Sequence, residues 1–314
     1  MIKNGVSYLI VFCITINVYS QQLSQYSNFV SNAFYYNPAV VGGHNCLVLK
    51  GGQRNQWIGF EGAPKTSFVS VSTSINNAKN FQPGTYIGLG GYLQTETFGA
   101  FRRSTVNLAY AYSTPLKGKT SIAYGLYLGF QELVIDGSLM SLQIGNDPII
   151  SGSSRKLLIP DIGAGLFLEN TNWYIGYSAK QIAMNNWSGL IESELSKNRF
   201  HHFIMGGKRI KAEGFNLVPN TLLKYTNNSP AAIDLNLNLE TFNNIFNLGI
   251  SWRNLDAIIA LLHLNIVDHL NIYYAFDFST SKINTSNSNT HELIIGYKSC
   301  PKTTNKEPSC PLFY

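Results

Sequence analysis

The feature that most constrains this chain is an alternation of apolar and polar residues with a period of two. The clearest case is residues 233–240, where every odd position is aliphatic and every even position is polar. This period is typical of a β-strand that separates an apolar environment from water, because successive side chains point to opposite faces. Similar alternation recurs at residues 86–93, 106–112, 121–130, 272–278 and 293–297. The sequence therefore predicts an all-β fold.

The alternation predicts fourteen strands, and most have about the 9 to 11 residues that a tilted strand needs to cross a bilayer. They are expected near residues 46–56, 65–75, 85–95, 102–113, 121–133, 158–168, 173–181, 200–209, 215–225, 231–240, 245–252, 256–264, 270–278 and 290–298. An even number of strands suits a barrel that closes without leaving an unpaired backbone edge in lipid. We therefore predict a transmembrane, up-and-down antiparallel β-barrel of about 14 strands in an outer membrane.

The connections between the predicted strands differ in length on the two sides of the barrel. The longest are expected at residues 134–157 and 182–199, and both fall on the same side. Outer-membrane barrels have long extracellular loops and short periplasmic turns. We therefore expect these two loops outside the cell and both chain termini in the periplasm.

The composition excludes several other classes of protein. Charged residues make up only 13% of the chain, about half of the roughly 25% in ordinary soluble domains, so a conventional cytosolic enzyme is not expected. No run of basic residues indicates nucleic-acid binding. Tyr and Trp favour membrane interfaces, because one end of the side chain is apolar and the other contacts water. We expect interfacial aromatic girdles that include Trp57, Trp173, Trp252 and Tyr297.

The first residues are typical of a secretory signal peptide. Lys3 precedes an interrupted apolar stretch at residues 6–18, and cleavage is expected near Ser20. A short anchor helix is the alternative, which the brevity of the stretch disfavours. The predicted organisation is a signal peptide at 1–20, an N-terminal periplasmic segment at 21–45, the β-barrel at 46–298 and a C-terminal periplasmic tail at 299–314.

Three cysteines follow the predicted signal peptide. In an oxidising compartment, Cys300 and Cys310 could close a small loop in the tail, which would leave Cys46 over. No paired Cys or His spacing near them indicates a metal site.

The sequence contains no motif that predicts an enzyme. The G-x-S-x-G elbow, the phosphate-binding glycine loop and the H-E-x-x-H zinc motif are all absent. His201 and His202 are adjacent in a predicted strand, so they point to opposite faces and cannot share one metal ion. We therefore expect no catalytic residue, no cofactor and no metal. A barrel hydrolase is the least favoured class.

Short motifs in the first third of the mature chain resemble those of a known family. In order, they are Tyr36-Asn37-Pro38-Ala39, Arg54-Asn55-Gln56-Trp57 and Gly62-Ala63-Pro64-Lys65-Thr66. Later motifs continue the series: Tyr110-Ala111-Tyr112, Asp234-Leu235-Asn236, Trp252-Arg253, His291-Glu292 and Gly296-Tyr297. Together they resemble the PorP/SprF family of the Bacteroidota type IX secretion system over nearly the whole mature chain.

The resemblance implies a non-enzymatic outer-membrane component that supports the export or cell-surface anchoring of secreted adhesins and, in gliding bacteria, motility. The implied partners are a secreted adhesin or its C-terminal sorting domain, periplasmic secretion components and outer-membrane lipid, without nucleic acid. The alternative is a general porin or small-solute channel. A porin should have an open lumen, whereas the Gly- and Tyr-rich strands at 86–93 and 121–130 favour a filled one.

The candidate partner-binding or structural residues come from these motifs and from one aromatic position in a predicted external loop. They are Asn37, Pro38, Arg54, Asn55, Gln56, Trp57, Pro64, Lys65 and Trp187. Asn37 and Pro38 should bend the chain before the first strand. Arg54 and Gln56 should share one face and hold the barrel mouth together, because they are two positions apart in a strand.

Overall fold

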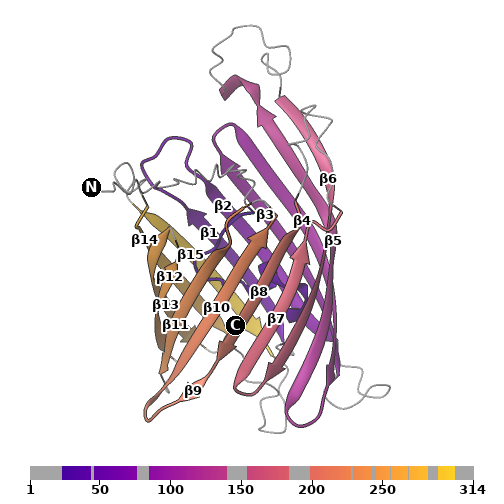
Figure 1. The fold of residues 1–314 in the computed structure, drawn as a ribbon, viewed down its shortest axis with the longest axis vertical. Coiled ribbons are helices and arrows are strands. Elements are labelled where there is room, and N and C mark those ends of the chain that lie inside the picture. The colour runs from indigo at the N-terminus through magenta and orange to yellow at the C-terminus, as the bar shows by residue number, and fades with distance from the viewer. Residues whose placement is uncertain are drawn as a thin grey trace, which may run out of the picture.

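The strands of this protein form one antiparallel sheet that closes into a barrel (Figure 1). The computed structural model describes residues 23–43, 46–75, 85–139, 154–183, 199–227, 229–241, 245–254, 256–267, 269–281 and 289–300. The sheet closes because β1 pairs with β15 and β10 pairs with β11. All remaining pairings in the wall join strands that follow one another in the chain.

The wall of the barrel consists of fourteen strands. They are β1 (Leu47–Asn55), β2 (Lys65–Ile75), β3 (Tyr86–Phe98), β4 (Phe101–Pro115), β5 (Thr120–Asp136), β6 (Ser154–Asn170), β7 (Trp173–Lys180), β8 (His201–Lys208), β10 (Phe215–Thr226), β11 (Ala232–Thr241), β12 (Phe246–Arg253), β13 (Ala257–Val267), β14 (Leu270–Ser279) and β15 (Thr290–Ser299). The fifteenth strand of the sheet, β9 (Ile210–Lys211), only extends the pairing along β10. The predicted fold class is confirmed.

The two faces of the wall differ in the sense that a membrane barrel requires. On β11, Leu235 and Leu237 point outward and are 47% and 43% exposed, whereas Asp234 and Asn236 point inward and are 1% and 5% exposed. An aliphatic outer face and a polar inner face suit a barrel in lipid. Two of the proposed girdle residues, Trp252 and Tyr297, also lie exposed on the outer face.

The ends of the barrel are called the mouth and the base below. The mouth is the end at which β1, β5 and β7 finish, and the base is the end at which β1 begins. The wall rises highest at the mouth along β5 and β6, which have 17 residues each, and steps down to 8 residues in β7 and β8 (Figure 1).

Residues 23–43, called the plug below, fold inside the barrel. They include α1 (Ala33–Tyr36) and the 3₁₀ helix η1 (Pro38–Val40), and Tyr26, Phe29 and Ala39 are fully buried. This differs from the periplasmic location that we expected for residues 21–45. The physical reason is composition: the plug has five aromatic residues and no Asp, Glu, Lys or Arg, so it can fill a lumen without bringing a charge into it.

The hydrophobic core of the protein therefore lies in the lumen, between the plug and the inner face of the wall. Buried aromatic rings of the plug pack with inward rings of the strands. Tyr26 contacts Phe68 edge to face at 5.2 Å, and Phe68 stacks on Tyr92 at 5.4 Å between ring centroids. Within the described residues, no helix is long and apolar enough to cross a membrane.

A disulfide bond joins Cys46 to Cys300 across a sequence separation of 254 residues. Cys46 directly precedes β1 and Cys300 directly follows β15, and the two strands pair from Leu47 and Ser299 onward. The pairing of Cys300 with Cys310, which the sequence left open, is therefore excluded. Closure of the barrel brings the first and last strands together, which residue spacing could not reveal. Cys310 lies outside the described residues.

Candidate functional site

The inner wall contacts the plug most closely along a row of glycines. A Cβ atom on Gly88 of β3 would lie 1.9 Å from the Val41 carbonyl oxygen, and one on Gly125 of β5 would lie 2.2 Å from the Ala39 nitrogen. Any side chain at these positions would displace η1 from the wall. The alternation in these strands thus places glycine on the inner face at the points where the plug backbone lies against the wall.

The Asn37-Pro38 motif forms the corner at which η1 begins. The Asn37 side chain accepts a hydrogen bond from the Ala39 N–H at 2.9 Å, which caps the helix. Its amide Nδ2 donates to the Leu166 carbonyl oxygen of β6 at 3.0 Å. Pro38 has no N–H to leave unpaired at this first helical position. The motif therefore bends the chain, as predicted, but it does so inside the lumen.

Near the mouth, three charged side chains form hydrogen bonds with the plug at Ser27. Glu292 accepts hydrogen bonds from the backbone N–H groups of Ser27 and Asn28, at 2.7 and 2.9 Å. The Ser27 hydroxyl donates to Asp277 at 2.6 Å. Arg54 donates to the Ser27 hydroxyl oxygen and forms ion pairs with Asp277 at 3.0 Å and Glu292 at 3.4 Å. These contacts join β1, β14 and β15 through the plug.

A second buried arginine extends this network. Arg253 of β12 pairs with Asp234 at 3.2 Å and with Asp277 at 3.5 Å, and it donates to the Tyr26 carbonyl oxygen at 3.0 Å. Lys224 pairs with Asp234 from the other side at 2.9 Å.

The mouth cluster is the set of six charged residues Arg54, Lys224, Asp234, Arg253, Asp277 and Glu292. Three are cations and three are anions, and they are linked by five ion pairs of 2.9 to 3.5 Å. These six buried side chains are therefore formally neutral as a set, which favours their burial, because an unpaired buried charge is strongly unfavourable. Arg253 also pairs at 3.1 Å with Asp256, whose side chain is 26% exposed and lies outside this buried set.

Other barrel side chains donate hydrogen bonds to carbonyl oxygens of the plug. Lys180 donates to Tyr35 at 3.1 Å and lies 4.0 Å from the centre of its ring. Ser178 donates to Tyr36 at 2.6 Å. Since these contacts satisfy backbone acceptors that water would otherwise solvate, they help to hold the plug against the wall.

Tyr26 forms a further polar link between the plug and the wall. Its hydroxyl donates to the Gln94 side chain at 3.0 Å and accepts from Tyr92 at 3.2 Å.

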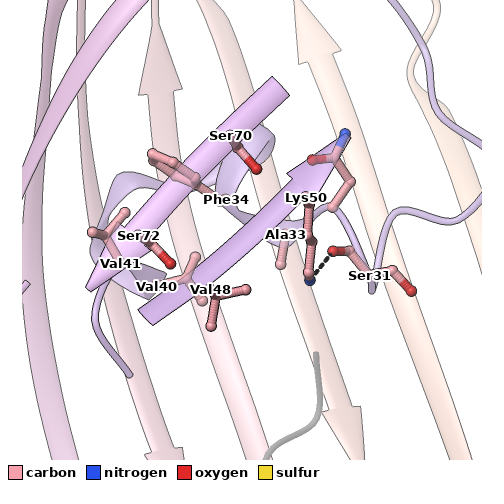
Figure 2. A pocket seen from close by; sticks show the side chains of 10 residues that line it. Ser31, Ala33, Phe34, Val40, Val41, Val48, Lys50, Ser70 and Ser72 are labelled. Carbon is pink, nitrogen blue, oxygen red and sulfur yellow. Dashed lines mark hydrogen bonds between the residues drawn. The ribbon is translucent and has the colours of Figure 1, made fainter. Parts of the chain in front are cut away.

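A small cavity remains between the plug and strands β1 and β2. Its volume is about 30 Å³, room for about two water molecules at 10 to 15 Å³ each. Figure 2 shows Lys50 reaching across from β1 to the Ser31 carbonyl oxygen beside this cavity. A cavity of this size holds water but provides no passage for a solute.

Asn55, Gln56, Trp57, Pro64 and Lys65 lie at the mouth ends of β1 and β2 or in the connection between them. The Gln56 N–H donates to the Pro64 carbonyl oxygen at 3.0 Å, and the Trp57 N–H donates to the Thr290 hydroxyl at 3.0 Å. Asn55 accepts from Gln53 at 3.2 Å, and Lys65 is exposed. Thus only Arg54 of this motif belongs to the mouth cluster, and Trp187 lies outside the described residues.

Sequence reasoning missed the residues with which Arg54 interacts. Asp277 and Glu292 occupy inward positions in strands whose residues alternate between apolar and polar, so the face to which each side chain points was predictable. Their convergence on Ser27 depends on barrel closure. The plug itself carried one signal: a periplasmic segment would be expected to contain charges, and residues 23–43 contain none. Within the described residues, no group of three or more His, Cys, Asp or Glu is placed to hold a metal ion.

The closed wall, its apolar outer face and the charged and polar side chains on its inner face define an outer-membrane β-barrel, here with a lumen filled by its own N-terminal segment. The toluene transporter TodX of Pseudomonas putida has a similar fold, with a TM-score of 0.52, 10% identity, and coverage of 88% of this chain and 94% of TodX. The CymD monoaromatic hydrocarbon channel gives a TM-score of 0.51 at 10% identity, covering 87% of this chain and 94% of CymD.

Residues 18–297 match the PorP/SprF family, described as type IX secretion system membrane proteins, so the chain belongs to this family. No curated protein matches it significantly. The identification suggested by the short sequence motifs is confirmed.

Proposed function

We propose that this protein is a non-enzymatic outer-membrane component of the type IX secretion system that supports the export or cell-surface anchoring of secreted adhesins. In gliding bacteria this role would serve motility. Membership of the PorP/SprF family supports the link to type IX secretion. The choice between a docking barrel and a channel depends on the lumen.

The observation that carries the proposal is the plug. Residues 23–43 fill the lumen with a packed aromatic core and are hydrogen-bonded to β1, β3, β6, β7, β12, β14 and β15. A porin or small-solute channel, the alternative function, requires an open aqueous path. A filled barrel instead favours a rigid platform whose two ends bind other proteins.

The two ends of the barrel suggest two sets of partners. We place the mouth outside the cell, because its connections include the longest ones and outer-membrane barrels have long extracellular loops. A secreted adhesin, or its C-terminal sorting domain, would then bind the connections that follow β5 and β7, at 137–153 and 181–200. Trp187 belongs to the second connection. Periplasmic secretion components would bind the turns at the base.

The first test is extraction of the tagged protein from its native outer membrane in mild detergent, followed by identification of bound proteins by mass spectrometry. We expect a stoichiometric adhesin or periplasmic secretion component. The purified barrel should be silent in planar bilayers. An isolated barrel that conducts ions would favour the channel instead.

The second test removes residues 140–153 from one long loop. Loss of the docking site should release the adhesin from cells into the medium. The matched control replaces the base turn at 117–119, which should leave retention at the surface unchanged. The Cys46–Cys300 disulfide reports on folding in both variants. Full retention of the adhesin after removal of residues 140–153 would contradict the proposed docking site.

A further inference from the structure

The plug has a direction, which its contacts define at both ends. At its N-terminal end, Ser27 contacts Arg54, Asp277 and Glu292. Arg54 is the second-last residue of β1, and Glu292 is the third residue of β15, so these side chains lie at the mouth. Ser24, three residues earlier, accepts a hydrogen bond from Gln94 in the mouth half of β3.

The other end of the plug lies at the base. A Cβ atom on Gly42 would lie 2.6 Å from the Gly88 Cα atom, and Gly88 is the third residue of β3, which starts at the base. The same Cβ atom would lie 3.1 Å from the carbonyl oxygen of Thr73, near the end of β2. From here the chain continues to Cys46 and into β1. The plug therefore crosses the lumen from mouth to base.

We propose that the amino terminus of the mature protein is presented at the mouth, on the same face as the connection at 56–64, while Cys300 lies at the base. Cleavage near Ser20 would leave two residues before Leu23. Two extended residues reach roughly 7 Å, whereas the hydrocarbon core of a bilayer is about 30 Å thick. The new amino terminus cannot return to the base, so it and Cys300 lie on opposite sides of the membrane.

This placement replaces the expectation that both termini are periplasmic. It also makes the amino terminus part of the interaction surface formed by the mouth connections. A polypeptide that docks on this face would meet the start of the plug beside Trp57 and the other residues of the 56–64 connection. Only the identity of that partner rests on the proposed function; the placement of the amino terminus does not.

The test introduces one free cysteine at a time and labels it with a maleimide that cannot cross membranes. Gln21→Cys probes the amino terminus, Glu61→Cys the mouth and Lys117→Cys the base, each in a Cys310→Ser background. Glu61 and Lys117 are both exposed. In intact cells we expect Gln21→Cys to be labelled on the same side as Glu61→Cys, at a rate within about threefold, and Lys117→Cys to require permeabilisation.

The comparison separates this inference from the proposed orientation. If Lys117→Cys is labelled in intact cells and the other two are not, the proposed orientation is wrong but the inference holds. If Gln21→Cys is labelled under the same conditions as Lys117→Cys and not under those of Glu61→Cys, the inference is wrong. An epitope tag inserted after Ser20 gives a second measurement with the same expected pattern, and the Cys46–Cys300 disulfide shows that each variant has folded.

Discussion

The mouth cluster makes a quantitative prediction for Glu292→Gln. The substitution keeps the shape of the side chain but removes one of three negative charges, so the cluster acquires a net charge of +1 in a buried site. One oxygen can still accept a hydrogen bond from the plug, while the second N–H of Ser27 or Asn28 loses its acceptor. Breaking a buried ion pair costs about 3 to 5 kcal/mol. Because Arg54 keeps its ion pair with Asp277, we expect the lower end, about 3 kcal/mol.

The assay is urea unfolding of the purified barrel in lipid vesicles, followed by its heat-modified mobility in gels. The matched control is Glu240→Gln, the same chemical change at a carboxylate that pairs with Arg209 at 2.9 Å but is 22% exposed. Partly exposed ion pairs contribute about 0 to 1 kcal/mol, so this variant should unfold close to the wild type.

The double variant Arg54→Gln/Glu292→Gln tests whether charge balance is the cause. It restores neutrality, so its destabilisation should be smaller than the sum of the two single effects by about 0.5 to 3 kcal/mol. Equal destabilisation by Glu292→Gln and Glu240→Gln, or strict additivity in the double variant, would refute the reasoning.

Three further predictions concern the plug and the disulfide at the junction of β1 and β15. Gly125→Val should displace η1 and admit small solutes in a vesicle-swelling assay; Gly51→Ala, whose Cβ atom would lie 3.8 Å from its nearest neighbour, should not. Asn37→Ala should lower the free energy of unfolding by the cost of a helix cap, about 1 kcal/mol, and should therefore lower the urea midpoint. Cys46→Ser should destabilise the barrel by up to about 5 kcal/mol, because the disulfide closes a very long loop. If the wild-type barrel has the same urea midpoint with and without a reducing agent, the last expectation is contradicted.

The strands were predictable because their signal is local. Residues 233–240 alternate within eight positions, and β11 was found at Ala232–Thr241. In a membrane barrel each strand separates lipid from lumen, so the residues of each strand alternate between those suited to lipid and those suited to the lumen. The number of strands and the difference between mouth and base follow from the same pattern.

The candidate site was predictable only in part. Asn37-Pro38 and Arg54 were selected as motif residues, and both contribute to the interface between plug and wall. Gln56 was expected to share the environment of Arg54, but β1 ends at Asn55, so the alternation that relates positions two apart no longer applies. Side-chain direction can be extrapolated along a strand but not beyond its end.

By itself, the sequence determined the class of fold, the direction of most side chains and the family. Only the tertiary structure decided what fills the lumen, how Cys46 is paired and which side chains meet at Ser27. Several of these contacts join residues that are 250 or more positions apart, such as Ser27 with Glu292 and Cys46 with Cys300. Such contacts form because the sheet closes on itself around an uncharged segment, and closure is a property of all fourteen strands together.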